Sequence, residues 1–286
     1  MTRRKKRPCT PKHTFSNNRW GHYVHQWCRV NRVYRKVISG TFASRCGKIC
    51  LMSHPEQRGF FAAVAAANRS LISGAKILEI GSYDVNGNLR SLFAMAGEYT
   101  GVDLKEGPGV DLVSFGHEID YADGSYDITI SGECLEHDPH WQDTFINMAR
   151  MTRPGGLVAF SCASLGRPEH GTTRTYKTDS PGTQSLGLDY YRNLTAADFH
   201  GLELPSIFSR WQFWYLPTHF DLYFVGAKSG DTTVRFPSDA AIKKLRRLMP
   251  LSDRLARVPM RLLARSVSPA RYQSIILPVW SRPPAS

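Results

Sequence analysis

The sequence lacks several features that would place it in specialised protein classes. No apolar run approaches the about 20 residues that a membrane-spanning helix needs, and no apolar signal-peptide segment follows Met1. No Cys-x-x-Cys pair occurs, and the six cysteines are unevenly spaced, which does not suggest a disulfide framework. A hydrophobic content of 42% excludes a disordered chain. These observations predict a cytoplasmic protein with a globular core.

Acidic residues are missing from the beginning of the chain. Residues 1–55 contain 13 Lys and Arg and no Asp or Glu, and residues 232–286 contain 11 basic and 2 acidic residues. The segment between them has a net charge of −9, although the whole chain of 286 residues carries +13. The basic ends favour an anionic partner, either RNA or a membrane surface to which the protein is peripheral. The charge pattern predicts three parts: a basic N-terminal extension (1–54), a globular domain (55–230) and a basic C-terminal helical extension (231–286).

Histidine, cysteine and aromatic residues are concentrated in residues 13–50. Cys46-x-x-x-Cys50 together with Cys28 leaves open a zinc site, although the spacing is irregular. An irregular arm that packs aromatic side chains on the core is the alternative, as is base stacking on single-stranded nucleic acid. We expect no metal in the globular domain.

The segment from Lys76 to Ile80 is the strongest structural signal in the sequence. It is a short apolar run rich in β-forming residues, which is typical of a buried parallel strand. Gly81 permits a tight turn, Asn86-Gly87 is a second turn signal, and we expect a helix to begin near Asn88. A strand, a glycine turn and a helix together form the ligand cradle of nucleotide-binding α/β folds. The Gly-x-Gly-x-x-Gly fingerprint is absent.

Further strands and helices follow at the spacing of an alternating α/β domain. A helix over 55–73 precedes the first strand, and an acid at Asp103 ends the second strand, at the distance from which ribose hydroxyls are commonly bound. The remaining expected elements are strands at 99–103, 110–115, 126–131 and 157–162, a helix at about 139–152, a hairpin at 207–216 and 220–227, and basic amphipathic helices over 238–276.

Four short blocks resemble the S-adenosylmethionine-dependent methyltransferases with a Rossmann-like sheet. They are Leu-Glu-Ile-Gly at 78–81, Gly-Val-Asp at 101–103, the segment 126–137 that ends in Leu-Glu-His, and Arg-Pro-Gly-Gly at 153–156. The resemblance implies an α/β fold whose mostly parallel seven-stranded sheet is flanked by helices. It departs from the family at Tyr83 and Val85, where glycine is common, so the path of the turn past the methionine part of the cofactor stays open.

The resemblance implies that S-adenosyl-L-methionine is the cofactor. Glu79 is expected to orient the turn or accept a hydrogen bond from the cofactor's amino group, while Gly81 allows close approach of the backbone. The two carboxylate oxygens of Asp103 match the two ribose hydroxyls. His117 and Glu118 are expected near the adenine, and Ser82 and Leu104 complete the predicted cofactor contacts.

The acceptor is expected beyond the carboxyl ends of the fourth and fifth strands. Methyl transfer to a hydroxyl requires a base for the departing proton, and His137 and Glu133 are the candidates. The polar segment 163–193 has no apolar period and supplies His, Arg and Tyr side chains, which favours a lid over the acceptor.

Two enzymatic functions and one non-enzymatic function fit these observations. The first is methylation of a small molecule or a saccharide, on a glycan or lipid-linked intermediate, and no obligate protein partner is indicated. The second is RNA methylation, with the basic extensions holding the nucleic acid. The segment after the fourth strand lacks the Asn/Asp-Pro-Pro-Tyr motif and the Pro-Cys nucleophile that resembling nucleic-acid enzymes use. The third is cofactor binding without catalysis.

Overall fold

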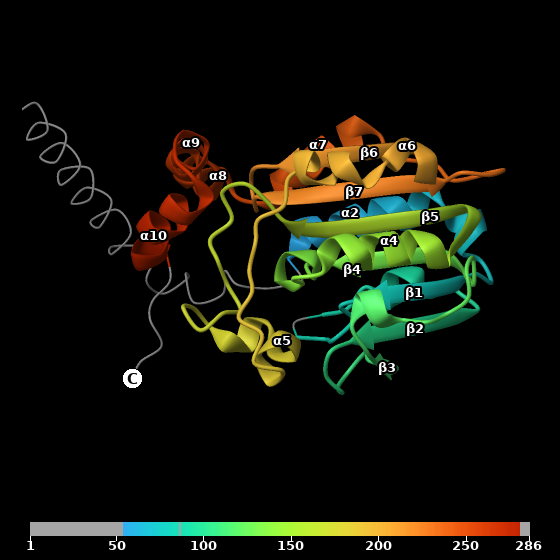
Figure 1. Cartoon of the computed structure of the whole chain (residues 1–286). Coiled ribbons are helices and arrows are strands. Elements are labelled where there is room, and N and C mark those ends of the chain that lie inside the picture. The colour runs from blue at the N-terminus through green and yellow to red at the C-terminus, as the bar shows by residue number, and fades with distance from the viewer. Residues whose placement is uncertain (1–53, 86, 281–286) are drawn as a thin grey trace, which may run out of the picture. The chain divides into compact units, whose positions relative to one another are not determined.

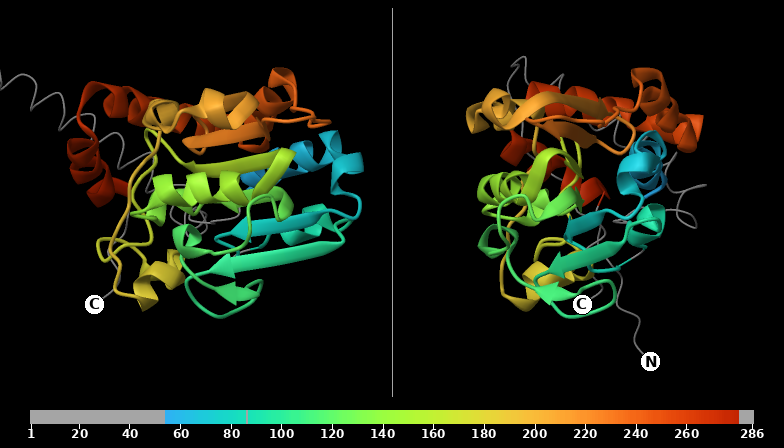
Figure 2. Two further views of the ribbon diagram at one scale, coloured as in Figure 1. Left: turned by 45° about the vertical axis from the view of Figure 1, so that its right-hand side comes forward. Right: turned by 90° about the vertical axis from the view of Figure 1, so that its right-hand side faces the viewer.

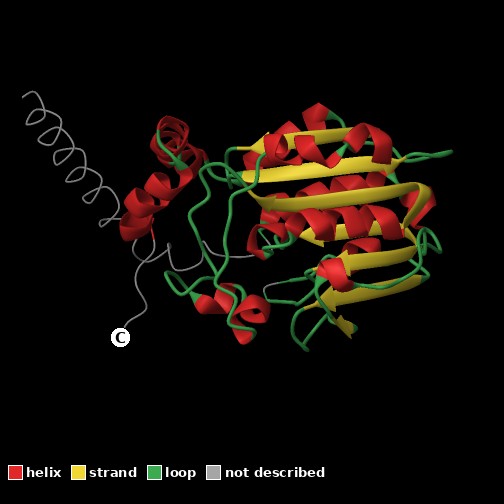
Figure 3. Cartoon of the chain, in the orientation of Figure 1, coloured by secondary structure: helices red, strands yellow, loops and turns green. Residues whose placement is uncertain are grey.

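The structure is a computed structural model that describes residues 54–85 and 87–280 (Figure 1). Seven strands of this part of the chain form one sheet in the order β3-β2-β1-β4-β5-β7-β6 (Figure 3). In chain order the strands are β1 (Lys76–Ile80), β2 (Glu98–Asp103), β3 (Leu112–Val113), β4 (Tyr126–Gly132), β5 (Thr152–Ala163), β6 (Phe208–Leu216) and β7 (Asp221–Lys228).

Strands β1 to β5 are parallel to one another, and β7 is antiparallel to both β5 and β6. This arrangement confirms the predicted Rossmann-like, mostly parallel seven-stranded sheet. The order of the strands reverses between β1 and β4, because β2 lies on one side of β1 and β4 on the other. In open α/β sheets, ligands bind beyond the carboxyl ends of the strands at such a reversal.

Helices cover both faces of the sheet (Figure 2). On one face α2 (Pro55–Ala67) and α7 (Asp239–Leu245) pack with β1, β4 and β7 around Phe60, Phe61 and Ile128. On the other face α4 (Trp141–Met151) buries Phe145 and Met148 against the same strands. The central strands read as continuous apolar runs in the sequence because both of their faces are covered.

Three sequence predictions about secondary structure were wrong in extent. The helix expected from Asn88 is only a four-residue 3-10 turn, η2 (Arg90–Phe93), because β2 already begins at Glu98. The third strand has two residues where six were expected, since it pairs only with the last two residues of β2. The last helix, α10 (Pro269–Trp280), continues through Pro278 and so extends beyond residue 276, where the basic helices were expected to end.

The remaining elements are short. Residues 55–73 form two helices, since α3 (Arg69–Ile72) follows α2 after Asn68. The others are η3 (Gly116–Glu118), η4 (Leu135–His137), η5 (Lys177–Asp179), α5 (Pro181–Ser185), η6 (Ala196–Leu202), α6 (Leu204–Ile207), η7 (Arg246–Leu248), α8 (Leu251–Ala256) and α9 (Val258–Ser266).

The segment 164–193, called the insertion below, joins β5 to Leu194 and contains no strand among its described residues. Helix α10 holds its first part in place. The Tyr272 hydroxyl donates to the Gly166 carbonyl at 2.6 Å, and Gln273 bonds both Arg167 and Glu169. Tyr272 also joins Phe220 and Met260 in a third apolar cluster. The C-terminal helices therefore stabilise the insertion, whose polar sequence has no apolar period of its own.

Candidate active site

The first part of the site is the turn after β1. Gly81 has a φ of +80°, and both Gly81 and Ser82 donate their backbone N–H to the Val102 carbonyl of β2. A Cβ atom on Gly81 would lie 2.5 Å from the Cβ of Cys134, so the turn needs glycine for conformation and for space. The turn thus brings the ends of β1, β2 and β4 into contact.

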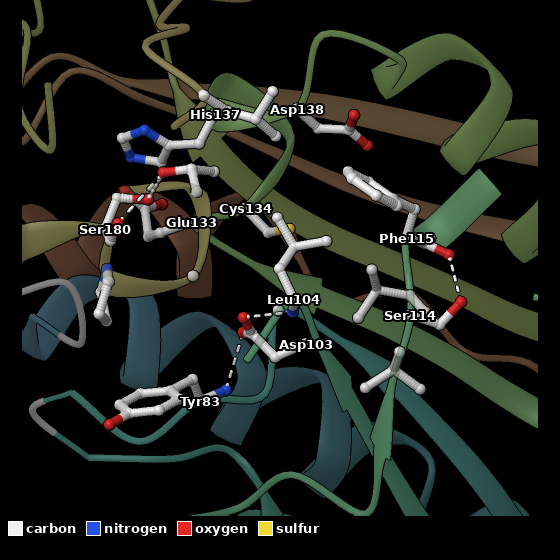
Figure 4. Close-up of a pocket in the computed structure, with 18 of the residues that line it drawn as sticks. Tyr83, Asp103, Leu104, Ser114, Phe115, Glu133, Cys134, His137, Asp138 and Ser180 are labelled. Carbon is white, nitrogen blue, oxygen red and sulfur yellow. Dashed lines mark hydrogen bonds between the residues drawn. The ribbon is translucent and has the colours of Figure 1, made fainter. Parts of the chain in front are cut away.

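Asp103 ends β2 beside this turn. Its two carboxylate oxygens accept hydrogen bonds from the backbone N–H groups of Tyr83, at 3.0 Å, and Leu104, at 2.7 Å (Figure 4). Burial raises the pKa of Asp103, and the two backbone donors act in the opposite direction. The two amides fix the orientation of the carboxylate, and each oxygen retains acceptor capacity for a ligand.

A cavity of about 680 Å³, open to solvent, lies beyond the carboxyl ends of β1, β2 and β4. Gly81 and Asp103 both line this cavity, as expected if they contribute to one cofactor site. The strand ends and the residues after them contribute Ile80, Val102, Leu104, Ser114, Phe115 and Gly116, and the turn after β1 contributes Tyr83 and Val85. The segment after β4 contributes Glu133, Cys134, His137, Asp138 and Pro139. The insertion contributes Ser180, Pro181, Gly182, Thr183 and Leu188.

These residues fit a nucleoside. Apolar side chains of Val102, Leu104 and Phe115 provide a surface for a base, and Asp103 provides acceptors for sugar hydroxyls. The insertion approaches Asp103 so closely that a Cβ atom on Gly182 would lie 2.6 Å from the carboxylate. Asp103 and the insertion therefore belong to one cavity.

Glu79 and Ser82 lie in a smaller adjoining cavity of about 350 Å³, which shares Gly81, Tyr83 and Val85 with the large one. Glu79 is buried, and its carboxylate accepts a hydrogen bond of 2.6 Å from the Tyr99 hydroxyl. Desolvation raises the pKa of Glu79 to about 7, although the Tyr99 hydrogen bond and Arg90 lower it. A buried acid of this kind fits the predicted contact with an amino group.

This pKa predicts a stability effect at Glu79→Gln. Glu79 keeps its proton in the folded protein, whereas the unfolded chain releases it above pH 4.5. The stabilisation that the protonated Glu79 gives the folded state is therefore complete below pH 4.5 and is lost as the pH rises to about 7. A shift of this size corresponds to roughly 3 kcal/mol. In urea titrations, the free energy of unfolding of the wild type should fall relative to the variant over that interval. Parallel pH profiles of the two proteins would contradict the shift.

The structure does not bring every predicted cofactor residue to the cavity. Leu104 lines it, whereas His117 and Glu118 are not among its lining residues. They lie in η3, where the His117 ring packs 4.3 Å from the His140 ring and most of the Glu118 side chain is exposed. Ser114, Phe115 and Gly116, directly before them, occupy the position beside the cavity.

The two predicted catalytic residues lie at the other end of the cavity. Figure 4 shows Glu133 and His137 next to Ser180 of the insertion, on the far side of Cys134 from Leu104. Glu133 has a φ of +53°, a strained conformation for a residue with a side chain, of the kind that occurs at functional sites. Strand β4 ends at Gly132, so this strain turns the backbone toward η4.

Burial controls the protonation of this end of the site. It raises the pKa of Glu133 well above its ordinary value, and the neighbouring carboxylates of Asp221 and Glu136 act in the same direction. Burial lowers the pKa of His137 to about 4, and Arg167 contributes. His137 is therefore a neutral imidazole near pH 7, with a lone pair available.

The insertion packs directly on His137. The rings of His170 and Tyr191 lie 4.9 and 5.4 Å from the His137 ring, and a Cβ atom on Gly171 would lie 2.9 Å from it. Most of the insertion from Arg167 to Thr172 is buried. The residues of the insertion that line the cavity are Ser180 to Thr183 and Leu188, whereas Arg174 and Tyr176, expected as donors to the acceptor, do not line it and are about half exposed.

A buried ionic network lies behind Glu133. Asp221 at the start of β7 pairs with Arg167 at 3.1 Å and with His54 at 2.6 Å, and Arg167 also approaches Glu133 at 3.8 Å. His54 stacks on His219, which pairs with Glu56. Sequence analysis missed this network because its members come from four distant segments, and only the unusual density of charged residues near apolar strands signals it.

Known proteins show similarity to the central part of the chain. Residues 78–160 match the model of a family described as a methyltransferase domain. This segment contains β1 from Leu78 onward, β2, β3, β4 and most of β5, together with Gly81, Asp103, Glu133 and His137. The predicted family is confirmed for this segment, which carries a methyltransferase domain of the class with a Rossmann-like sheet.

Two curated relatives are described as uncharacterized methyltransferases, from Mycobacterium marinum and Mycobacterium ulcerans. Each is 33% identical over 132 residues, which covers 37% of this chain and 51% of the relative. This chain therefore spans about half the length of the curated relatives it matches.

Solved structures are similar at a lower level. One is the 1,6-didemethyltoxoflavin-N1-methyltransferase of Burkholderia thailandensis with S-adenosylhomocysteine, at 17% identity and a TM-score of 0.42, over 77% of this chain and 93% of that chain. Another is the phosphoethanolamine N-methyltransferase 2 of Haemonchus contortus, at 14% identity and a TM-score of 0.41, over 55% of this chain and 49% of that chain.

Two regions complete the comparison with the sequence. The zinc site and the nucleic-acid arm considered for residues 13–50 lie outside the described residues. In residues 54–85 and 87–280, no helix combines the length and the apolar character that crossing a bilayer requires.

Proposed function

We propose that this protein is an S-adenosylmethionine-dependent methyltransferase that acts on a hydroxyl of a small-molecule or saccharide acceptor. One observation carries the proposal. The Asp103 carboxylate, fixed by two backbone amides, faces the same cavity as Gly81 and as the two candidate bases Glu133 and His137. A cofactor whose sugar is bound at Asp103 would have its reacting end directed along that cavity.

In this proposal, each group of site residues has a separate role. Asp103 binds the ribose hydroxyls, the apolar wall around Leu104 and Phe115 holds the base, and Glu79 accepts from the amino group. Bound S-adenosylmethionine supplies a methyl group activated by a sulfonium. The insertion covers the cavity and excludes water, and Glu133 or His137 accepts the proton of the acceptor hydroxyl. Glu133 and His137 are both buried, and electrostatic interactions with the reacting groups are stronger there than in water.

The lining of the cavity favours a small or saccharide acceptor over RNA. None of the cavity-lining residues that the structure describes is Lys or Arg, and the insertion presents the hydroxyls of Ser180 and Thr183. A polyanion would need cationic side chains beside the reacting group, whereas hydroxyl groups and carboxylates suit hydroxylated ligands.

The C-terminal helices favour an acceptor that is linked to lipid. Four leucines of this region are more than half exposed, namely Leu248, Leu251, Leu255 and Leu262. They alternate with basic residues such as Arg254 and Arg261, the composition of helices that lie on anionic membrane surfaces.

The decisive experiment is transfer of a labelled methyl group. Purified protein is incubated with S-adenosylmethionine carrying a tritiated methyl and with fractionated cell extract. We expect the label in the lipid-extractable or glycan fraction, resistant to nuclease. Asp103→Ala, which retains both candidate bases, serves as the control and should transfer little label. Nuclease-sensitive label would establish RNA as the acceptor, and absence of transfer in all fractions would contradict the proposed activity.

A further inference from the structure

Three buried side chains converge at one point beside the cavity, and the proposed mechanism gives a role to only one of them, His137. Glu136 and His137 belong to η4, directly after β4, and His170 comes from the insertion. One potential ligand atom from each lies within 4.8 Å of the other two, and all three residues are buried. We propose that Glu136, His137 and His170 bind a divalent transition-metal cation.

Both histidines have ring nitrogens at this point without a hydrogen-bond partner in the described part of the chain. The His170 Nδ1 atom lies 3.2 Å from the Pro168 carbonyl, so this nitrogen carries the proton and Nε2 is left unprotonated. His170 Nε2 is buried and has no hydrogen-bond partner among the described residues. Both ring nitrogens of His137 are buried and also lack a hydrogen-bond partner among the described residues. A backbone carbonyl that fixes the tautomer and the ring, as Pro168 does for His170, is typical of metal-binding histidines.

Glu136 provides the charge. One oxygen of its carboxylate, Oε1, accepts a hydrogen bond of 3.1 Å from the Ala163 backbone. The other oxygen, Oε2, is buried and accepts no hydrogen bond from another residue that the structure describes. Leaving such buried atoms unpaired is unfavourable, because nothing offsets the loss of their hydrogen bonds to water. A single cation would satisfy the free oxygen and the free imidazole nitrogens together.

A neighbouring cluster of potential metal ligands is already paired with a cationic side chain. His54, Glu133 and Asp221 also have ligand atoms within 4.8 Å of one another. There, however, Arg167 already supplies the positive charge, at 3.1 Å from Asp221 and 3.8 Å from Glu133, and His54 bonds Asp221. Arg167 also acts electrostatically on Glu136, His137 and His170, but Glu136 Oε2 and the free imidazole nitrogens of this cluster still lack a hydrogen-bond partner among the described residues.

The donor set selects the kind of metal. Two imidazole nitrogens and one carboxylate oxygen suit zinc or ferrous iron, whereas magnesium and calcium prefer oxygen ligands throughout. Three protein ligands leave at least one further position for water or a ligand oxygen. Since His137 lines the cavity, this position would lie beside the acceptor end of the site.

The function of the cation rests on the proposed methyl transfer, although its binding does not. A hydroxyl oxygen bound to a divalent cation loses its proton more readily. With His137 bound to the metal, Glu133 would be the group that accepts this proton. The acceptor class would then be a hydroxylated compound able to bind a metal through oxygen.

The test uses the full chain, freed of metal with a chelator and titrated with Co²⁺ while its absorption is recorded. A site of two imidazoles and a carboxylate gives cobalt d–d bands, whereas a thiolate site adds intense sulfur-to-cobalt charge transfer. We expect one equivalent of Co²⁺ with d–d bands alone, displaced by one equivalent of Zn²⁺. This spectrum separates the proposed site from any cysteine site in residues 13–50.

Two variants locate the site. His170→Gln and Glu136→Gln should each weaken Zn²⁺ binding in calorimetry by at least about 100-fold. The exposed His200→Gln is the matched control and should bind as the wild type does. Circular dichroism verifies that each variant is folded. Absence of a thiolate-free cobalt site in the wild type, or unchanged affinity in a folded variant, would overturn the proposal. Cofactor binding is measured separately, without metal, so failure of the proposed function is recognised independently.

Discussion

Asp103→Ala is expected to weaken binding of S-adenosylmethionine at least tenfold. Hydrogen bonds to a charged group contribute about 1.5–3 kcal/mol each, and the carboxylate offers acceptors to two ribose hydroxyls. The backbone amides of Tyr83 and Leu104, which now point at the carboxylate, would not replace these contacts because they are donors held by the chain. Isothermal titration calorimetry of wild type and variant measures the loss.

The exposed Asp120, which lies outside the cavity, provides the control for Asp103. Asp120→Ala removes the same charge from the domain and should leave the affinity unchanged. Asp103→Asn separates charge from shape, since it retains one acceptor oxygen, and we expect an affinity between those of the wild type and the alanine variant. Unchanged affinity in Asp103→Ala would remove this residue from the cofactor site and weaken the case for the proposed activity.

Arg167→Ala should lower the free energy of unfolding by roughly 3–5 kcal/mol, the cost of removing one partner from a buried ion pair. Arg167 is buried and pairs with Asp221, and it also donates to the His219 carbonyl at 2.8 Å. Without it, Asp221 and Glu133 would remain buried with less compensating charge. Urea denaturation monitored by tryptophan fluorescence measures the change.

Arg174, from the same insertion, is the matched control. Its side chain is about half exposed and pairs with Glu169, which also accepts a hydrogen bond from Thr172. Arg174→Ala should therefore lower the free energy of unfolding by no more than about 1 kcal/mol, as is usual for exposed ion pairs. Similar losses of unfolding free energy in the two variants would show that the buried network does not stabilise the fold as expected.

The sequence was most informative where local pattern and burial coincide. Lys76–Ile80 forms β1 over the predicted range, and β2 and β4 begin or end within one residue of the prediction. These strands are covered on both faces, so their residues must be apolar regardless of what lies elsewhere in the chain. The predicted hairpin forms β6 and β7, since the Pro-Thr-His break at 217–219 separates two long apolar segments.

Prediction failed where short elements depend on their neighbours. The length of β3 is decided by the two residues of β2 with which it pairs, and η2 is limited by the nearby start of β2. The cavity-lining residues after β3 are Ser114 to Gly116, one to three positions before the predicted His117. Local sequence gives the side of the sheet on which such residues lie, but a turn of one or two residues decides which of them face the cavity.

The sequence by itself determined the class of fold, the glycine turn and the acid at Asp103, because these features depend on chemistry within a few residues of one another. Only the tertiary structure brought His170 to His137, Arg167 to Asp221, and Ser180 to the cavity that Gly81 lines. The physical reason is that an irregular polar insertion has no periodicity from which its path can be predicted. Its course is set by packing against α10 and β7, segments that lie 50 to 100 residues further along the chain.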